Sequence, residues 1–170
     1  MFTLRFNPSR LQEFAGRYEY PTEDRIVNKI APRVRAAGCY NKSQFLEVCA
    51  WKTPRSKRHC RKNSEDFVVE VTRLALSNQH ERIRIEVLTL LSGVDWPTAS
   101  VLLHFGYDDL YPILDFRALW SVGVSAPPVY SSELWWRYVL FCRNAALKYG
   151  VSMRNLDRAL WQYSKEHQKT

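Results

Sequence analysis

Apolar residues recur at intervals of three and four positions along nearly the whole chain, which is the spacing of one helix face. No segment alternates strictly between apolar and polar residues over the length of a strand. The pattern therefore predicts an all-α fold, a compact multi-helix domain. The predicted helices begin near residues 21, 42, 64, 81, 96, 116, 132 and 152.

Glycine and proline mark where these helices stop or bend. Gly38 and Gly150 are expected to end two of them, because glycine accepts the left-handed conformation of a helix C-terminus. Pro32 is expected to kink or split the first helix, and residues 124–130, with Pro127-Pro128, to form a loop. The apolar faces predicted for the third and fourth helices are Phe67, Val68, Val71, Leu74 and Ala75, and Ile83, Val87, Leu88 and Leu91.

The most informative stretch covers residues 88–123, where two helices are joined by the tight turn Ser92-Gly93-Val94-Asp95. Free backbone N–H groups at a helix N-terminus attract anions. We therefore expect the amides of Gly93 and Val94 to face a nucleic-acid phosphate. An ordinary turn between two packed helices explains the same residues equally well. After the second helix, a short loop leads to Asp115 at the start of another helix.

Two motifs in this stretch resemble the helix-hairpin-helix (HhH-GPD) DNA glycosylase superfamily. The family hairpin, L-P-G-[VI]-G-x-[KxS]-T-A, stands here as Leu91-Ser92-Gly93-Val94-Asp95-Trp96-Pro97-Thr98-Ala99. The family's catalytic aspartate follows a short apolar loop, and Tyr111-Pro112-Ile113-Leu114-Asp115 stands in register with it. The resemblance implies a DNA-glycosylase-like all-α fold, with the helix-hairpin-helix and catalytic segment at about residues 81–123.

The departures from the family pattern narrow the expected chemistry. Pro97 occupies the position of the lysine that forms a Schiff base in bifunctional members, so the resemblance implies a monofunctional enzyme. The iron–sulfur subgroup has four cysteines near its C-terminus, whereas no cysteine follows Cys142, so we expect neither an iron–sulfur cluster nor another cofactor. Asp95 replaces the second hairpin glycine, and its charge would repel a phosphate. As a residue type, Asp95 is also a good helix N-cap.

The charge of the chain favours a polyanionic partner. Twenty-five Lys and Arg against 17 Asp and Glu give a net charge of +8, which suits double-stranded DNA but is also compatible with a basic protein that has no such partner. Residues 55–62, the basic segment, hold five Lys or Arg, and Trp51-Lys52 precede them. Mixed basic and aromatic surfaces suit nucleic-acid contact, although a solvated loop is the usual alternative. The residues expected to contact DNA are Lys52, Arg55, Lys57, Arg58, Gly93, Val94, Asp95, Trp96, Thr98 and Arg117.

The length and the cysteines set the broad class. A chain of 170 residues with 46% hydrophobic residues fits a single domain, residues 1–170, with a real core. The four cysteines have no zinc-site spacing, and Cys39, Cys49 and Cys142 lie in apolar surroundings, which predicts buried, reduced thiols in a cytoplasmic protein without a metal site. No apolar run is long enough for a signal peptide or a membrane span, so no membrane partner is expected.

Asp115 is the candidate catalytic residue, and a helix N-cap is the alternative interpretation. Breaking an N-glycosidic bond builds positive charge on the sugar, which a carboxylate can stabilise while it orients water. The leading hypothesis is a base-excision DNA repair hydrolase, a monofunctional glycosylase acting on a damaged or modified base. The alternatives are a non-enzymatic helix-hairpin-helix DNA-binding protein, or an all-α protein-interaction domain that exposes Trp135, Trp136 or Trp161.

Overall fold

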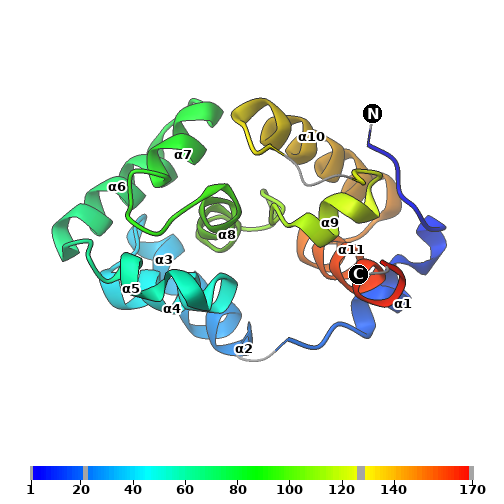
Figure 1. The fold of residues 1–170 in the computed structure, drawn as a ribbon, viewed down its shortest axis with the longest axis horizontal. Coiled ribbons are helices and arrows are strands. Elements are labelled where there is room, and N and C mark those ends of the chain that lie inside the picture. The colour runs from blue at the N-terminus through cyan, green and yellow to red at the C-terminus, as the bar shows by residue number, and fades with distance from the viewer. Residues whose placement is uncertain (1, 21–22, 126–128, 169–170) are drawn as a thin grey trace. The chain divides into compact units, whose positions relative to one another are not determined.

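The computed structural model describes residues 2–20, 23–125 and 129–168, and these residues form helices and connecting segments without any strand, which confirms the predicted all-α class. The chain divides into two compact units (Figure 1). Unit 1 consists of Met1–Tyr20 and Asp109–Thr170, and unit 2 of Pro21–Asp108. No composition shift marks either boundary in the sequence, which is why a single domain was expected. The predictions for Pro21 and for Pro127-Pro128 lie outside the described residues.

Unit 2 is built around α8 (Trp96–Gly106), which buries every residue from Thr98 to its end. The helices that pack on α8 are α3 (Ala31–Ala37), α4 (Lys42–Lys52), α6 (Glu65–Ser77) and α7 (Glu81–Leu88), as Figure 1 shows. Its shorter elements are α2 (Glu23–Arg25), η2 (Ile26–Ile30), η3 (Pro54–Ser56) and α5 (Lys57–Cys60).

Pro32 splits the first predicted helix, as expected. The split is made by η2, a wide turn of π-helix in which the Ala31 N–H donates to the Ile26 carbonyl. Pro32 lies directly after this turn, in the first turn of α3, where its missing N–H interrupts the ladder of backbone hydrogen bonds. Gly38 ends α3 in the left-handed conformation at φ +65°.

The predicted apolar face of α6 is wrong at two positions. Phe67 and Leu74 are 42% and 46% exposed, whereas Thr72 is completely buried. The Thr72 hydroxyl donates to the Val68 carbonyl and accepts the Tyr40 N–H at 2.9 Å. Because both bonds satisfy its polar atoms, threonine occupies a core position that hydropathy assigns to an apolar residue.

The apolar face predicted for residues 83–91 is correct at Leu88 and Leu91 but wrong at Ile83. Ile83 is 43% exposed, and the buried face holds Arg84 with Ile85 and Leu88. The Arg84 guanidinium lies 4.9 Å from the centre of the Tyr107 ring, and its Nε donates to the Asn78 carbonyl at 2.5 Å, so the buried arginine has partners for its charge. The helix also ends at Leu88 rather than near residue 91, because the following amides turn back to carbonyls three residues earlier.

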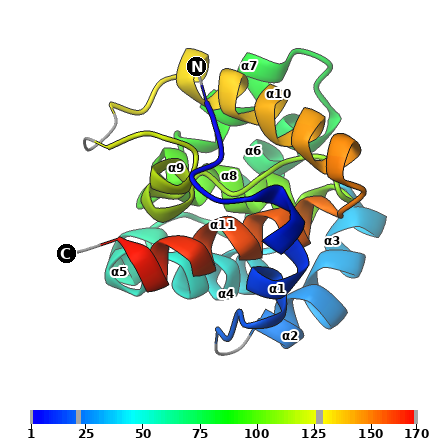
Figure 2. The ribbon, with the colours of Figure 1, turned by 90° about the vertical axis from the view of Figure 1, so that its right-hand side faces the viewer.

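Unit 1 is built around α11 (Met153–His167), against which α1 (Leu11–Gly16), α9 (Phe116–Ser121) and α10 (Ser132–Tyr149) pack, as Figure 2 shows for α1. The short η1 (Pro8–Arg10) precedes α1. Helix α10 has the predicted bounds. Trp135 is fully buried and stacks on Tyr111 at 5.9 Å between ring centres, so it contributes nothing to an exposed patch. Trp136 and Trp161 are half-buried.

Candidate nucleic-acid interface

The turn at residues 92–95 connects α7 to α8 in unit 2. Gly93 adopts φ +83°, and the Val94 N–H donates to the Leu91 carbonyl at 3.0 Å, which closes the turn. The Val94 amide, expected to face a phosphate, is therefore engaged within the protein. The Gly93 N–H has no hydrogen-bond partner among the described residues.

Asp95 is the N-cap of α8. Its Oδ1 accepts the Thr98 N–H at 3.0 Å, while Pro97 lies in the first helical turn and brings no N–H. A carboxylate thus occupies the helix end where a phosphate was expected to bind. The positive end of the helix dipole is already partly neutralised there, and this weakens the anion site.

Thr98, expected to contact DNA, is fully buried. Its hydroxyl lies 3.3 Å from the Thr53 hydroxyl, and its N–H is bound by the Asp95 cap. Thr98 therefore stabilises the turn through these two contacts. Trp96 and Lys52 are both half-buried.

The Asn63 side chain connects the basic segment to the turn through hydrogen bonds. Its side-chain Nδ2 donates to the Ser92 carbonyl at 3.0 Å, and its Oδ1 accepts the Ser92 N–H at 2.9 Å. The same Nδ2 also donates to the Cys60 carbonyl at 2.9 Å. This role could not be predicted, since an asparagine in front of a helix is an ordinary capping signal and does not indicate a contact with a residue 29 positions away.

The basic segment also packs directly on Gly93. A Cβ added to Gly93 would lie 2.8 Å from the Cys60 Sγ and 2.9 Å from the Cys60 N. Residues 55–60 of the segment are helical and belong to η3 and α5, and residues 61–62 form a turn after them. Arg55, Lys57 and Arg58 of this segment are exposed, while Cys60 and Asn63 make its contacts with the turn.

Burial changes the chemistry of Cys49, one of the three thiols in unit 2. It raises the pKa of Cys49 well above its usual range, so this thiol stays neutral. A hydrogen bond with Cys49 lowers the pKa of Cys60, whose Sγ lies 3.7 Å from the Gly93 carbonyl oxygen. Both thiols are buried, whereas Cys39, also expected to be buried, is half-exposed.

Gly93→Ala should destabilise the protein by about 2–5 kcal/mol, because left-handed strain adds to the collision with Cys60. The matched control is Gly38→Ala, at φ +65° with nothing within 4 Å of the added Cβ, where only the strain of about 1–2 kcal/mol is expected. Urea unfolding measures both. Equal losses of stability in the two variants would show that the contact with Cys60 does not contribute to the cost of a side chain at Gly93.

Asp115 lies in unit 1 and is the N-cap of α9. Its Oδ1 accepts the Arg117 N–H at 2.8 Å, and the side chain is half-exposed. Residues 111–114 reach it as an extended, buried segment, anchored by the Tyr111 ring on Trp135. The capping interpretation is therefore correct, and it holds the carboxylate in a fixed orientation at the surface.

Aromatic and cationic side chains gather next to the start of α9. The Arg117 guanidinium lies 5.7 Å from the centre of the Trp161 ring, and the Lys165 ammonium lies 5.3 Å from it. Tyr18 and Tyr20 meet the same ring edge-on at 5.3 and 5.9 Å. We call these residues the Trp161 cluster: Tyr18, Tyr20, Arg117, Trp161 and Lys165. Such a surface suits base stacking together with phosphate contact.

Of this cluster, only Arg117 was expected from the sequence to contact DNA. The remaining members come from the N-terminal segment and from α11, and nothing in their local pattern links them to Asp115.

A second carboxylate lies in the same unit. Asp157 is buried and forms an ion pair with Arg154 one turn earlier on α11. Burial raises the pKa of Tyr138 well above its usual range, and the charges of Cys142, Asp157 and Asp115 add to this. The Tyr138 hydroxyl is thus a neutral group influenced by both carboxylates. In the sequence, the three-residue spacing of Arg154 and Asp157 places both on one helix face and indicates this ion pair.

The described residues contain no group of three or more His, Cys, Asp and Glu side chains that could hold a metal ion. Among the same residues, no helix combines the length and the apolar character needed to cross a membrane. No family model, curated protein or solved structure matches the chain.

Proposed function

We propose that this protein binds double-stranded DNA as a helix-hairpin-helix glycosylase and hydrolyses the N-glycosidic bond of a damaged or modified base. The observation that carries the proposal is the attachment of the basic segment to the turn through Asn63 and Gly93. It concentrates exposed cations beside the segment that resembles the family hairpin. The resemblance itself supplies the reaction type.

The proposal assigns DNA backbone binding to unit 2. Lys57 and Arg58 on α5 contact phosphates as charges, and the Gly93 N–H contacts one as a hydrogen-bond donor. These contacts carry no sequence information, so they hold the duplex while the altered base is selected by other means.

The proposal assigns the chemistry to Asp115 in unit 1. The bond between the sugar C1′ and the base nitrogen breaks, and the base leaves with the bonding electron pair. The Asp115 carboxylate stabilises the cationic sugar and accepts a proton from the attacking water, whose oxygen bonds to C1′. That proton finally passes to the departing base. Pro97 provides no amine, so no Schiff base forms at the turn.

A second candidate function is DNA binding without catalysis. The N-cap bond to Arg117 accounts for the position of Asp115 without any reaction. This candidate shares the DNA-binding surface with the first, so the two differ only in base release.

The first experiment measures binding to a short duplex at several salt concentrations. We expect an affinity that falls steeply as salt rises, since each neutralised phosphate releases counterions. No binding at low salt would rule out both DNA-binding candidates and leave the protein-interaction domain.

Asp95→Asn should raise affinity for duplex DNA about two- to fivefold at low salt, because it removes a negative charge that repels phosphate. Asparagine is an equally good N-cap, so α8 keeps its first turn. Fluorescence anisotropy with a labelled duplex measures the change. An affinity identical to that of the wild type would place the turn away from the phosphates.

A further inference from the structure

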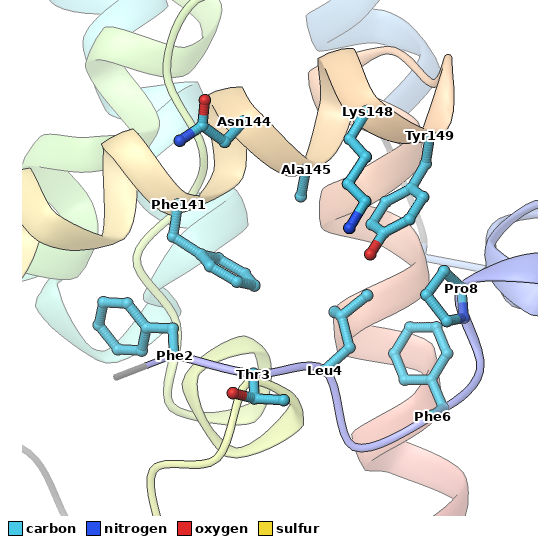
Figure 3. A pocket seen from close by; sticks show the side chains of 10 residues that line it. All are labelled: Phe2, Thr3, Leu4, Phe6, Pro8, Phe141, Asn144, Ala145, Lys148 and Tyr149. Atoms are coloured by element: carbon cyan, nitrogen blue, oxygen red, sulfur yellow. The ribbon is translucent and has the colours of Figure 1, made fainter.

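Unit 1 contains a hollow of about 390 Å³ between the N-terminal segment and α10 (Figure 3). Residues 2–8 alternate, with the even positions half-buried and the odd ones exposed. Two backbone bonds fix this wall, from Thr3 N–H to the Val122 carbonyl at 3.0 Å and from Arg5 N–H to the Ser121 carbonyl at 2.9 Å. The apolar lining consists of Phe2, Leu4, Phe6, Pro8, Phe141 and Ala145.

Two polar groups point into this hollow. Figure 3 shows the Lys148 ammonium and the Tyr149 hydroxyl directed toward its centre, above Leu4. The ammonium lies 5.4 Å from the centre of the Tyr149 ring and has no carboxylate partner among the described residues. None of the ten residues that line the hollow is acidic. The site therefore presents one positive charge over apolar walls.

We propose that this hollow binds a small amphipathic carboxylate. The ligand's apolar body lies against Phe2, Leu4 and Phe141, and its carboxylate binds the Lys148 ammonium and the Tyr149 hydroxyl. The volume falls in the range of small-molecule sites, which are mostly apolar with a few placed polar groups. A nucleotide fits less well, because its polar base edges would face apolar walls without hydrogen-bond partners.

The test is a titration with decanoate below its micelle concentration, followed by backbone amide shifts of the full chain. We expect saturable binding, with shifts concentrated at residues 2–8 and on α10, and weaker binding of decanol, which has no charge. Shifts spread over both units, or equal affinity for decanoate and decanol, would overturn the proposal.

Two variants locate the site. Lys148→Gln should weaken decanoate binding about three- to tenfold and leave decanol unchanged, since a partly exposed ion pair contributes modestly. Lys29→Gln, at an exposed lysine of unit 2 outside the hollow, is the matched control and should change neither affinity.

Leu4→Trp should abolish binding of both probes, because the larger indole ring fills the hollow. Leu4 is half-buried and lies in the N-terminal segment, so the substitution does not replace a core residue. An unchanged melting temperature establishes that this variant is folded. Undiminished decanoate binding in it, or tighter binding of a mononucleotide than of decanoate by the wild type, would contradict the proposal.

Discussion

Asp115→Asn should lower the rate of base release by about 10²–10⁴-fold, the contribution expected of a positioned general base. Affinity for duplex DNA should stay the same or rise, because a negative charge is removed. The substitution is well suited to the site, since asparagine accepts the Arg117 N–H as aspartate does and keeps α9 capped. Single-turnover cleavage measures the rate, with alkali to open the abasic product.

The matched control is Asp95→Asn, which makes the same change at the N-cap of α8. It should leave the single-turnover rate unchanged at saturating protein. If Asp115→Asn instead loses DNA affinity and base release together, Asp115 serves DNA binding or folding, and the catalytic assignment is wrong.

Replacing Lys57 and Arg58 together with Ala should weaken DNA binding and flatten its salt dependence. Each phosphate contact contributes about 0.9 to the slope of log affinity against log salt, so the slope should fall by about 1.8. Both side chains are exposed on α5, so the fold should tolerate the change. Anisotropy titrations at five salt concentrations give the slope.

The control for this pair is Lys29→Ala with Arg33→Ala, two exposed cations of unit 2 on η2 and α3. It removes the same charge from another part of the unit and should leave the slope nearly unchanged. Equal decreases in both double variants would show that net charge alone, and not the basic segment, determines binding.

Local signals predicted several helix ends. Gly38 and Gly150 end α3 and α10 in the left-handed conformation, as expected. The N-cap interpretation of Asp115 was also available from the sequence. Such signals act over three or four residues, so they can be recognised without knowing the fold.

Contacts between distant segments were not predictable. Thr72 is buried with the Tyr40 N–H as a hydrogen-bond donor, and Arg84 is buried against the Tyr107 ring. A hydropathy pattern does not reveal either partner, because each lies in a distant part of the sequence. Asn63 reaches Ser92, and Trp161 reaches Tyr18, through packing that no periodicity encodes. The division into two units is equally invisible, since both are helical and no linker composition separates them.

The most direct measurement of the central claim is base release by the wild-type protein from a panel of duplexes, each with one damaged or modified base. The account predicts that one lesion, or a small related set, yields alkali-sensitive abasic sites, while the undamaged duplex does not. Salt-sensitive binding of the duplexes with no release from any of them would contradict the enzymatic assignment and leave a DNA-binding protein without catalysis.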